Sequence, residues 1–248
     1  MKLRRKHIIE AKGDKTFQKC LAIALILKFK LKTSRIPHYS LNKLCKIAGI
    51  SHKTAEKYER WLLKYELIHF EGKGRNRVFI INSISSHTSN RNIAIEEIDF
   101  SNFFSTYRSL QSFIFMKLQH NKDFIQHLLQ SRHNPESSGE FKRVKRKVKD
   151  LVVQGKLKSA DVNYKEYGLS LKRIAKEIGC CVRTAQRVIK YALLKQWVER
   201  QHNFEWFNAP YVNHREVDGF TFSTKHKLCI VHPNTYCLSP TISQALSY

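Results

Sequence analysis

The feature that most constrains the fold of this chain is an internal repeat. When Ser170 is aligned with Ser40, an offset of 130 residues, two segments come into register without a gap. Seven positions are then identical, namely Ser40, Leu41, Lys46, Gly49, Thr54, Ala55 and Leu63 with Ser170, Leu171, Lys176, Gly179, Thr184, Ala185 and Leu193. A chain of 248 residues is long enough for two domains of ordinary size, and the repeat predicts that these are related.

Each copy of the repeat predicts two short helices joined by a turn. Ser40 and Ser170 are good N-cap residues, because a serine hydroxyl can accept from the unpaired amides of a first helical turn. Gly49 and Gly179 end these helices, since glycine tolerates the left-handed conformation common at a helix C-terminus. A second helix follows each glycine, and Ser51 caps the first of them. The apolar residues at three- and four-residue spacing are expected to face inward: Leu41, Leu44, Cys45, Ala48, Ala55, Tyr58 and Leu62 in the first copy, and Leu171, Ile174, Ala175, Ile178, Ala185, Val188 and Ala192 in the second.

A β-hairpin is predicted after the second helix of each copy. In the first copy, the β-rich runs 67–71 and 78–81 flank a basic loop that contains two glycines. In the second copy, residues 197–200 are followed by a longer connection and then by the β-rich runs 220–222 and 228–231. The second hairpin is therefore expected to be longer than the first.

Helix, glycine-containing turn, second helix and hairpin together resemble bacterial winged helix-turn-helix regulators. The resemblance rests on residues 51–58 through Leu67 and Ile68, and it covers roughly Phe17 to Ile81 and Phe141 to Val231. Two such modules in one small basic protein are also similar in layout to plasmid and phage replication initiators. The resemblance implies a mainly α fold with small β-hairpin wings, of the α+β class, and DNA as the partner.

The segments that flank and separate the two copies of the repeat give the domain boundaries. We expect a basic N-terminal arm over residues 1–15, a first winged helix-turn-helix domain over 16–85, a linker and helical insert over 86–139, a second such domain over 140–238, and a C-terminal tail over 239–248. Aromatic and aliphatic residues in 99–130 predict one long or two shorter amphipathic helices in the insert. The insert could pack the modules together or form a homodimer surface.

The net charge of the chain restricts the class of partner that it is expected to bind. The 45 lysines and arginines exceed the 20 aspartates and glutamates, which gives a formal net charge of +25 and favours a polyanion such as DNA, RNA or an anionic membrane. The most apolar run, residues 20–27, is far shorter than a membrane span needs. No signal peptide is recognisable, and the six scattered cysteines are typical of reduced thiols. We therefore expect a cytoplasmic, DNA-associated protein that has no membrane partner.

The solvent face of each second helix carries the candidate base-reading residues. The N-terminal part of such a helix enters the major groove, where arginine can pair with guanine, glutamine with adenine, and lysine with guanine or phosphate. Glu56 is the acidic exception in the first helix; it either accepts from cytosine or pairs with Lys53 or Arg60. A merely solvated helix face is the alternative for both helices. The candidates are His52, Lys53, Thr54, Lys57 and Arg60 in the first helix, and Val182, Arg183, Thr184, Gln186, Arg187 and Lys190 in the second.

Further basic residues are candidates for contacts with the DNA backbone. Lys73, Arg75 and Arg77 belong to the first hairpin loop, where arginine can enter the minor groove or bind phosphates. The basic residues of the N-terminal arm and the run 142–147 would add phosphate contacts that raise affinity without reading sequence. A hairpin that is basic only for solubility is the alternative for the loop.

Catalytic and metal-binding motifs are weak in this chain. Residues His226, Cys229, His232 and Cys237 are of zinc-ligand type, but on one strand His226 and Cys229 would face opposite sides. Walker A, His-Glu-x-x-His and paired-histidine nickase motifs are missing from the sequence, and a tyrosine recombinase is left open without support.

We therefore expect a protein that is not an enzyme, needs no cofactor and binds specific duplex DNA sequences. It would act as a replication initiator or transcriptional regulator of a phage, plasmid or other mobile element, with the replication or transcription machinery as a further partner. The alternative is a structural DNA- or RNA-binding protein that does not read bases.

Overall fold

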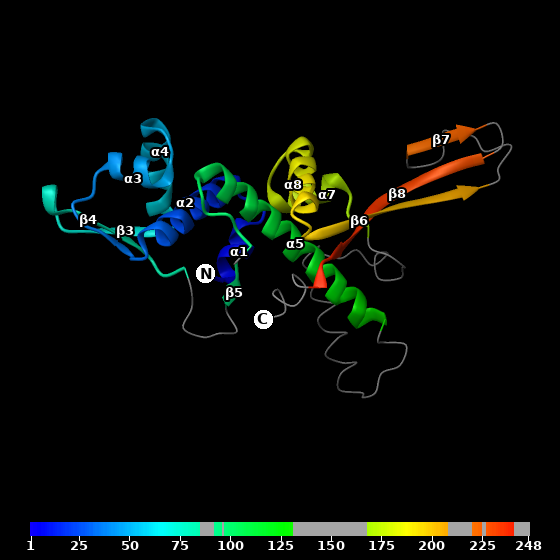
Figure 1. Ribbon diagram of the computed structural model, residues 1–248, viewed down its shortest axis with the longest axis horizontal. Helices are drawn as coiled ribbons and strands as arrows, with labels where there is room; N and C mark the ends of the chain where they lie inside the picture. Colours follow the sequence, from blue (N-terminus) through cyan, green and yellow to red (C-terminus); the bar gives the residue numbers. More distant parts are fainter. Residues whose placement is uncertain (85–91, 96, 131–167, 208–219, 225–226, 241–248) are drawn as a thin grey trace, which may run out of the picture.

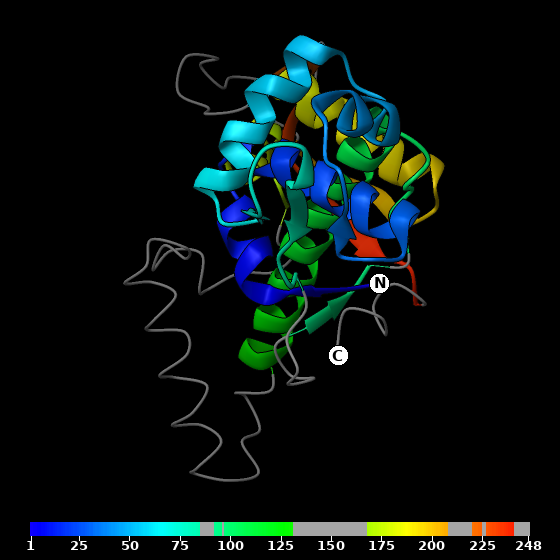
Figure 2. The same cartoon turned by 90° about the vertical axis from the view of Figure 1, so that its left-hand side faces the viewer.

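The computed structural model describes residues 1–84, 92–95, 97–130, 168–207, 220–224 and 227–240. Within these residues the chain is mainly helical, with seven α-helices and three small antiparallel sheets (Figures 1 and 2). The α+β class expected from the sequence is confirmed at this level. The predicted linker residues 133–139, the basic run 142–147 and nearly all of the C-terminal tail lie outside the described residues.

Helix α2 (Lys15–Leu31) forms the centre of the N-terminal half. Asp14 caps it, because the Asp14 carboxylate accepts from the amides of Thr16 and Phe17, each at 2.9 Å. Every side chain from Cys20 to Leu27 is fully buried, which identifies the apolar run of the sequence as a core helix. No helix in the described part of the chain has the length and apolar character needed to cross a membrane.

Helices α3 (Leu41–Ala48) and α4 (His52–Lys64) pack against α2 as the first helix pair. Ser40 and Ser51 cap the two helices, and Gly49 ends α3 with a φ of 66°. A three-stranded sheet of order β2–β4–β3 accompanies the pair, with β2 before α3 and the other two strands after α4. Its strands are β2 (Arg35–Ile36), β3 (Ile68–Glu71) and β4 (Val78–Ile81), and the short 3-10 helix η1 (Gly74–Asn76) lies between β3 and β4.

Helices α7 (Leu171–Ile178) and α8 (Val182–Leu194) form the second helix pair. Ser170 caps α7 and Gly179 ends it with a φ of 72°. The sheet that follows has the order β6–β8–β7, made of β6 (Val198–Phe207), β7 (Phe220–Thr224) and β8 (Lys227–Leu238). Strands β6 and β8 pair from Val198 and Leu238 to Phe207 and Leu228, so this hairpin is longer than β3–β4, as predicted.

The sequence repeat extends to details of the backbone. Gln196 (φ 56°) and Glu66 (φ 54°) occupy equivalent positions and are both left-handed. The amide of Leu67 donates to the carbonyl of Leu62 at 2.9 Å, and its equivalent Trp197 donates to Ala192 at 3.0 Å. The chain therefore leaves the second helix of each pair through the same kind of turn.

The predicted insert contains one long helix, α5 (Phe103–Gln130), which starts beside α2 and runs beneath the second helix pair (Figure 1). It packs against α2, α7 and α8. The Ser109 hydroxyl lies 3.1 Å from the Tyr191 hydroxyl of α8, and the Ser112 hydroxyl donates to the carbonyl of Val188 at 3.4 Å. Helix α5 therefore supports the second pair much as α2 supports the first, and one apolar core runs through both halves.

The basic N-terminal residues form regular structure. Strand β1 (Lys2–Arg4) pairs antiparallel with β5 (Asn92–Ala94), and α1 (Arg5–Ala11) packs against α2. Leu3 and Ile8 are buried, which ties the segment to the core. Residues 1–11 are therefore part of the folded body.

Candidate nucleic-acid interface

Helices α4 and α8 lie on the same side of the molecule. Figure 1 shows the two helix pairs above α2 and α5, with the sheet β2–β4–β3 at one end of the molecule and the sheet β6–β8–β7 at the other. In α4 the inward positions Ala55, Tyr58 and Leu62 are buried. The equivalent positions of α8, Ala185, Val188 and Ala192, are buried too, so both helices turn their polar faces to solvent.

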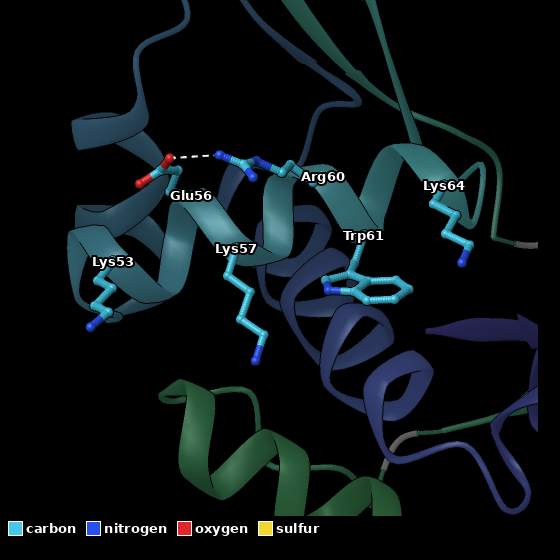
Figure 3. Close-up of a pocket in the computed structure, with 6 residues that line it drawn as sticks. All are labelled: Lys53, Glu56, Lys57, Arg60, Trp61 and Lys64. Carbon is cyan, nitrogen blue, oxygen red and sulfur yellow. Dashed lines mark hydrogen bonds and ion pairs between the residues drawn. The ribbon is translucent and has the colours of Figure 1, made fainter.

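The exposed face of α4 is basic but contains an internal ion pair. Lys53 and Lys57 are exposed, and the Arg60 guanidinium donates to the Glu56 carboxylate at 2.9 Å (Figure 3). The Arg60 and Glu56 side chains are 78% and 54% exposed, so solvent screens this pair and either group can be drawn to another partner. His52, at the start of the helix, is exposed as well.

Two further residues of α4, which the sequence did not single out, line a shallow depression on this face. The depression has a volume of about 470 Å³ and is lined by Lys53, Glu56, Lys57, Arg60, Trp61 and Lys64 (Figure 3). The Lys64 ammonium lies 4.6 Å from the centre of the Trp61 ring, which is a cation–π contact. Helical spacing could have identified Trp61, because it lies four residues after Lys57 on the same face.

The exposed face of α8 has a different chemistry. Arg183, Gln186, Arg187 and Lys190 are all exposed, and Val182 is 40% exposed. Helix α8 contains no acidic residue, and within the described part of the chain none of these four polar side chains has a hydrogen bond or ion pair. Among the described residues, nothing therefore competes with an external partner for their donors or for the Gln186 amide.

The two candidate threonines belong to the helix starts. The Thr54 and Ser51 hydroxyls are 2.8 Å apart, and the Thr184 hydroxyl lies 3.3 Å from Sγ of Cys181. Thr54 and Thr184 are half-buried, so their hydroxyls support the N-terminal turns. Backbone amides at these turns carry the positive end of the helix dipole, which favours an anion such as phosphate.

The first hairpin presents only part of its basic residues to solvent. Lys73 is exposed, whereas Arg77 is half-buried with its guanidinium 3.4 Å from the centre of the Phe70 ring. This stacking holds Arg77 against the sheet. The backbone of Arg75 lies in η1, and its side chain is outside the described residues.

The cysteines have contrasting environments. Burial raises the pKa of Cys20 to about 12, which keeps this thiol protonated and unreactive near neutral pH. Cys181 is fully exposed at the N-cap of α8, and its hydrogen bond with the Thr184 hydroxyl lowers its pKa. Cys20, Cys45, Cys180, Cys181 and Cys237 are free thiols.

A metal site is not found among the described residues, where no three His, Cys, Asp or Glu side chains are grouped to hold an ion. Of the four residues considered for zinc, His226 lies outside the described residues, as do the side chains of Cys229 and His232. Cys237 is exposed on β8.

Comparisons with protein-family models, curated proteins and solved structures give no significant match to this chain.

Proposed function

We propose that this chain is a sequence-specific duplex DNA-binding protein made of two winged helix-turn-helix modules. In the first module, α3 and α4 form the helix-turn-helix and β3–β4 the wing, supported by α2. In the second, α7 and α8 form the helix-turn-helix and β6–β8 the wing, supported by α5. The initiator or regulator role in a phage, plasmid or other mobile element belongs to the same proposal.

One observation carries this proposal. Two helices at equivalent positions of a repeated backbone lie on the same side of the molecule, and both present basic side chains to solvent. A duplex offers major grooves of a width that admits one α-helix, and successive grooves on one face are about 34 to 36 Å apart. A protein with two such helices on one side is suited to contact two subsites with a single chain.

The contacts would divide into two chemical kinds. Arg183, Arg187 and Gln186 of α8 offer the donor and acceptor patterns that pair with guanine and adenine in the major groove. Lys53, Lys57 and Lys73 offer point charges that suit phosphates, which fix register and supply affinity. The formal net charge of +25 adds long-range attraction to the duplex.

The test is a titration with DNA at several salt concentrations, followed by competition with random duplex. Sites would first be selected from a random duplex library, which identifies the target if one exists. If six to ten phosphates are contacted, affinity should fall by about 10³ to 10⁵ between 50 and 200 mM salt. A flat salt response would contradict DNA binding, and equal affinity for selected and random duplexes would identify a structural nucleic-acid binder instead.

A further inference from the structure

The turn between α1 and α2 meets the turn between α7 and α8 at close range. The amide of Gly13 donates to the carbonyl of Glu177 at 3.1 Å, and the Lys12 ammonium lies 3.4 Å from the Glu177 carboxylate. A Cβ atom at Gly179 would lie only 2.6 to 2.8 Å from the backbone of Gly13. The two backbones can approach this closely only because residue 179 has no side chain.

Gln18 of α2 connects the same two turns from inside the core. Its side chain is fully buried, and its amide nitrogen donates to the carbonyl of Ala11 at 2.7 Å and to the carbonyl of Ile178. Ala11 is the last residue of α1 and Ile178 the last of α7, so one amide group satisfies carbonyls at two helix ends. The Gln111 amide of α5 donates to the Gln18 side-chain oxygen at 3.3 Å.

This cluster joins elements that carry different halves of the candidate interface. Helix α2 supports α4, and the carbonyl of Ile178 lies at the turn from which α8 begins. Buried hydrogen bonds of this kind specify one arrangement, because each alternative packing would leave a buried polar group without a partner. The described part of the chain gives the first helix pair no corresponding contact, since a Cβ atom at Gly49 would meet nothing within 4 Å there.

We propose that Gln18 and Gly179 are positioning residues that fix α8 relative to α4 and thereby set the spacing of the two DNA subsites. This inference rests on the proposed function for its DNA part. Its structural part, the coupling of the two helix pairs, stands on the contacts of Gln18 and Gly179 alone.

The matched variants are Gly179→Ala and Gly49→Ala. Both glycines have a left-handed φ, 72° and 66°, so alanine introduces the same conformational strain at each. Only the methyl group at position 179 collides with a neighbouring backbone. Gln18→Met keeps the shape of the side chain and removes its hydrogen bonds. It therefore disrupts the contact between the two turns without introducing a steric clash.

The first measurement is amide hydrogen exchange of the free protein. We expect Gly179→Ala and Gln18→Met to speed exchange at both turns together, residues 11–14 and 178–181, by about tenfold or more. Gly49→Ala should leave those two turns at the wild-type rate. Unchanged exchange in Gln18→Met would overturn the coupling.

The second measurement is binding to the selected DNA with zero, five or ten base pairs inserted between the subsites. Five base pairs turn one subsite to the opposite face of the duplex and ten return it, so wild type and Gly49→Ala should lose affinity at five and regain some at ten. The profile should be flat in Gln18→Met. A Gln18→Met profile like that of wild type would overturn the positioning role. If wild type itself bound all three spacings equally, binding at two subsites would be overturned, and the hydrogen-exchange measurement would still test the coupling of the two helix pairs.

Discussion

The two helix pairs have the same backbone and different surfaces. Both begin at a capping serine, turn at a left-handed glycine and leave the second helix through a left-handed residue, Glu66 in one pair and Gln196 in the other. Their exposed faces differ, because α4 holds the Glu56–Arg60 ion pair and α8 has no acidic residue. The backbone pattern thus fixes where a side chain is presented, and the individual residue decides what it can recognise.

The pairs also differ in how their glycine-containing turns are packed. Gly49 faces open space, whereas Gly179 lies against Gly13 and next to the carbonyl that Gln18 binds. Among the described residues, the turn of the second pair therefore has a close backbone contact for which the turn of the first pair shows no equivalent.

The largest expected effect comes from truncating equivalent residues of α4 and α8. In α8, Arg183→Ala and Arg187→Ala should each cost about 1 to 3 kcal/mol of discrimination between the selected site and a single-base variant of it. At the equivalent α4 positions, Lys53→Ala and Lys57→Ala should weaken binding to all duplexes by similar factors, because phosphate contacts carry no base information. Competition titrations with matched and substituted sites measure both quantities.

Equal losses on specific and random DNA in the Arg183 and Arg187 variants would contradict base reading by α8. The division of labour between the two helices would then be wrong, although both could still contact the duplex.

A smaller effect is expected from exchanging the N-cap residues of the two helices. The Ser51 hydroxyl accepts from the amide of Thr54, whereas the equivalent Cys181 makes no such bond from its side chain. Ser51→Cys should lower the free energy of unfolding by about 0.5 to 1 kcal/mol, and Cys181→Ser should raise it by a similar amount. Urea unfolding of the two single variants and the double variant measures these changes.

A loss of stability in Cys181→Ser would show that the thiol stabilises the start of α8 in a way serine cannot. The contrast between the two helix starts would then be a specialisation of α8 and not a weakness of it.

Local features of both helix pairs could be predicted from the sequence. Ser40, Gly49 and Ser51 act within one or two turns of their own position, so residue type and spacing were enough to place α3 and α4. The inward stripes followed from helical periodicity for the same reason. The glycine-containing loop likewise located the β3–β4 hairpin.

Long-range features could not be predicted in the same way. Gln18 and Ile178 are 160 positions apart, and a lone glutamine in an apolar helix gives no sign of its partner. The stacking of Arg77 on Phe70 was not predicted either, because spacing does not tell whether an arginine side chain extends into solvent or packs on an aromatic ring. Helix α5 was expected as an insert, but its packing on α7 and α8 follows from the tertiary fold.

The smallest expected effect concerns Glu56, the acidic residue that distinguishes the exposed face of α4 from that of α8. Glu56 of α4 is equivalent to Gln186 of α8, so Glu56→Gln gives α4 the residue type that α8 already has. The change removes a carboxylate that repels phosphate and releases Arg60 from its 2.9 Å ion pair. An exposed pair of this kind contributes about 0.3 to 0.5 kcal/mol, so stability should change little.

Affinity for random duplex should rise several-fold in Glu56→Gln, and the slope of log affinity against log salt should steepen by about 0.9 if Arg60 gains one phosphate. Glu59→Gln is the matched control: it makes the same charge change, but Glu59 is half-buried and bonded to the Tyr39 hydroxyl. If both variants raise affinity equally, the gain comes from net charge alone and the ion pair does not restrain Arg60. A gain confined to Glu56→Gln, lost again in the double variant Glu56→Gln with Arg60→Ala, would place Arg60 at the DNA backbone and show that the Glu56 carboxylate restrains it.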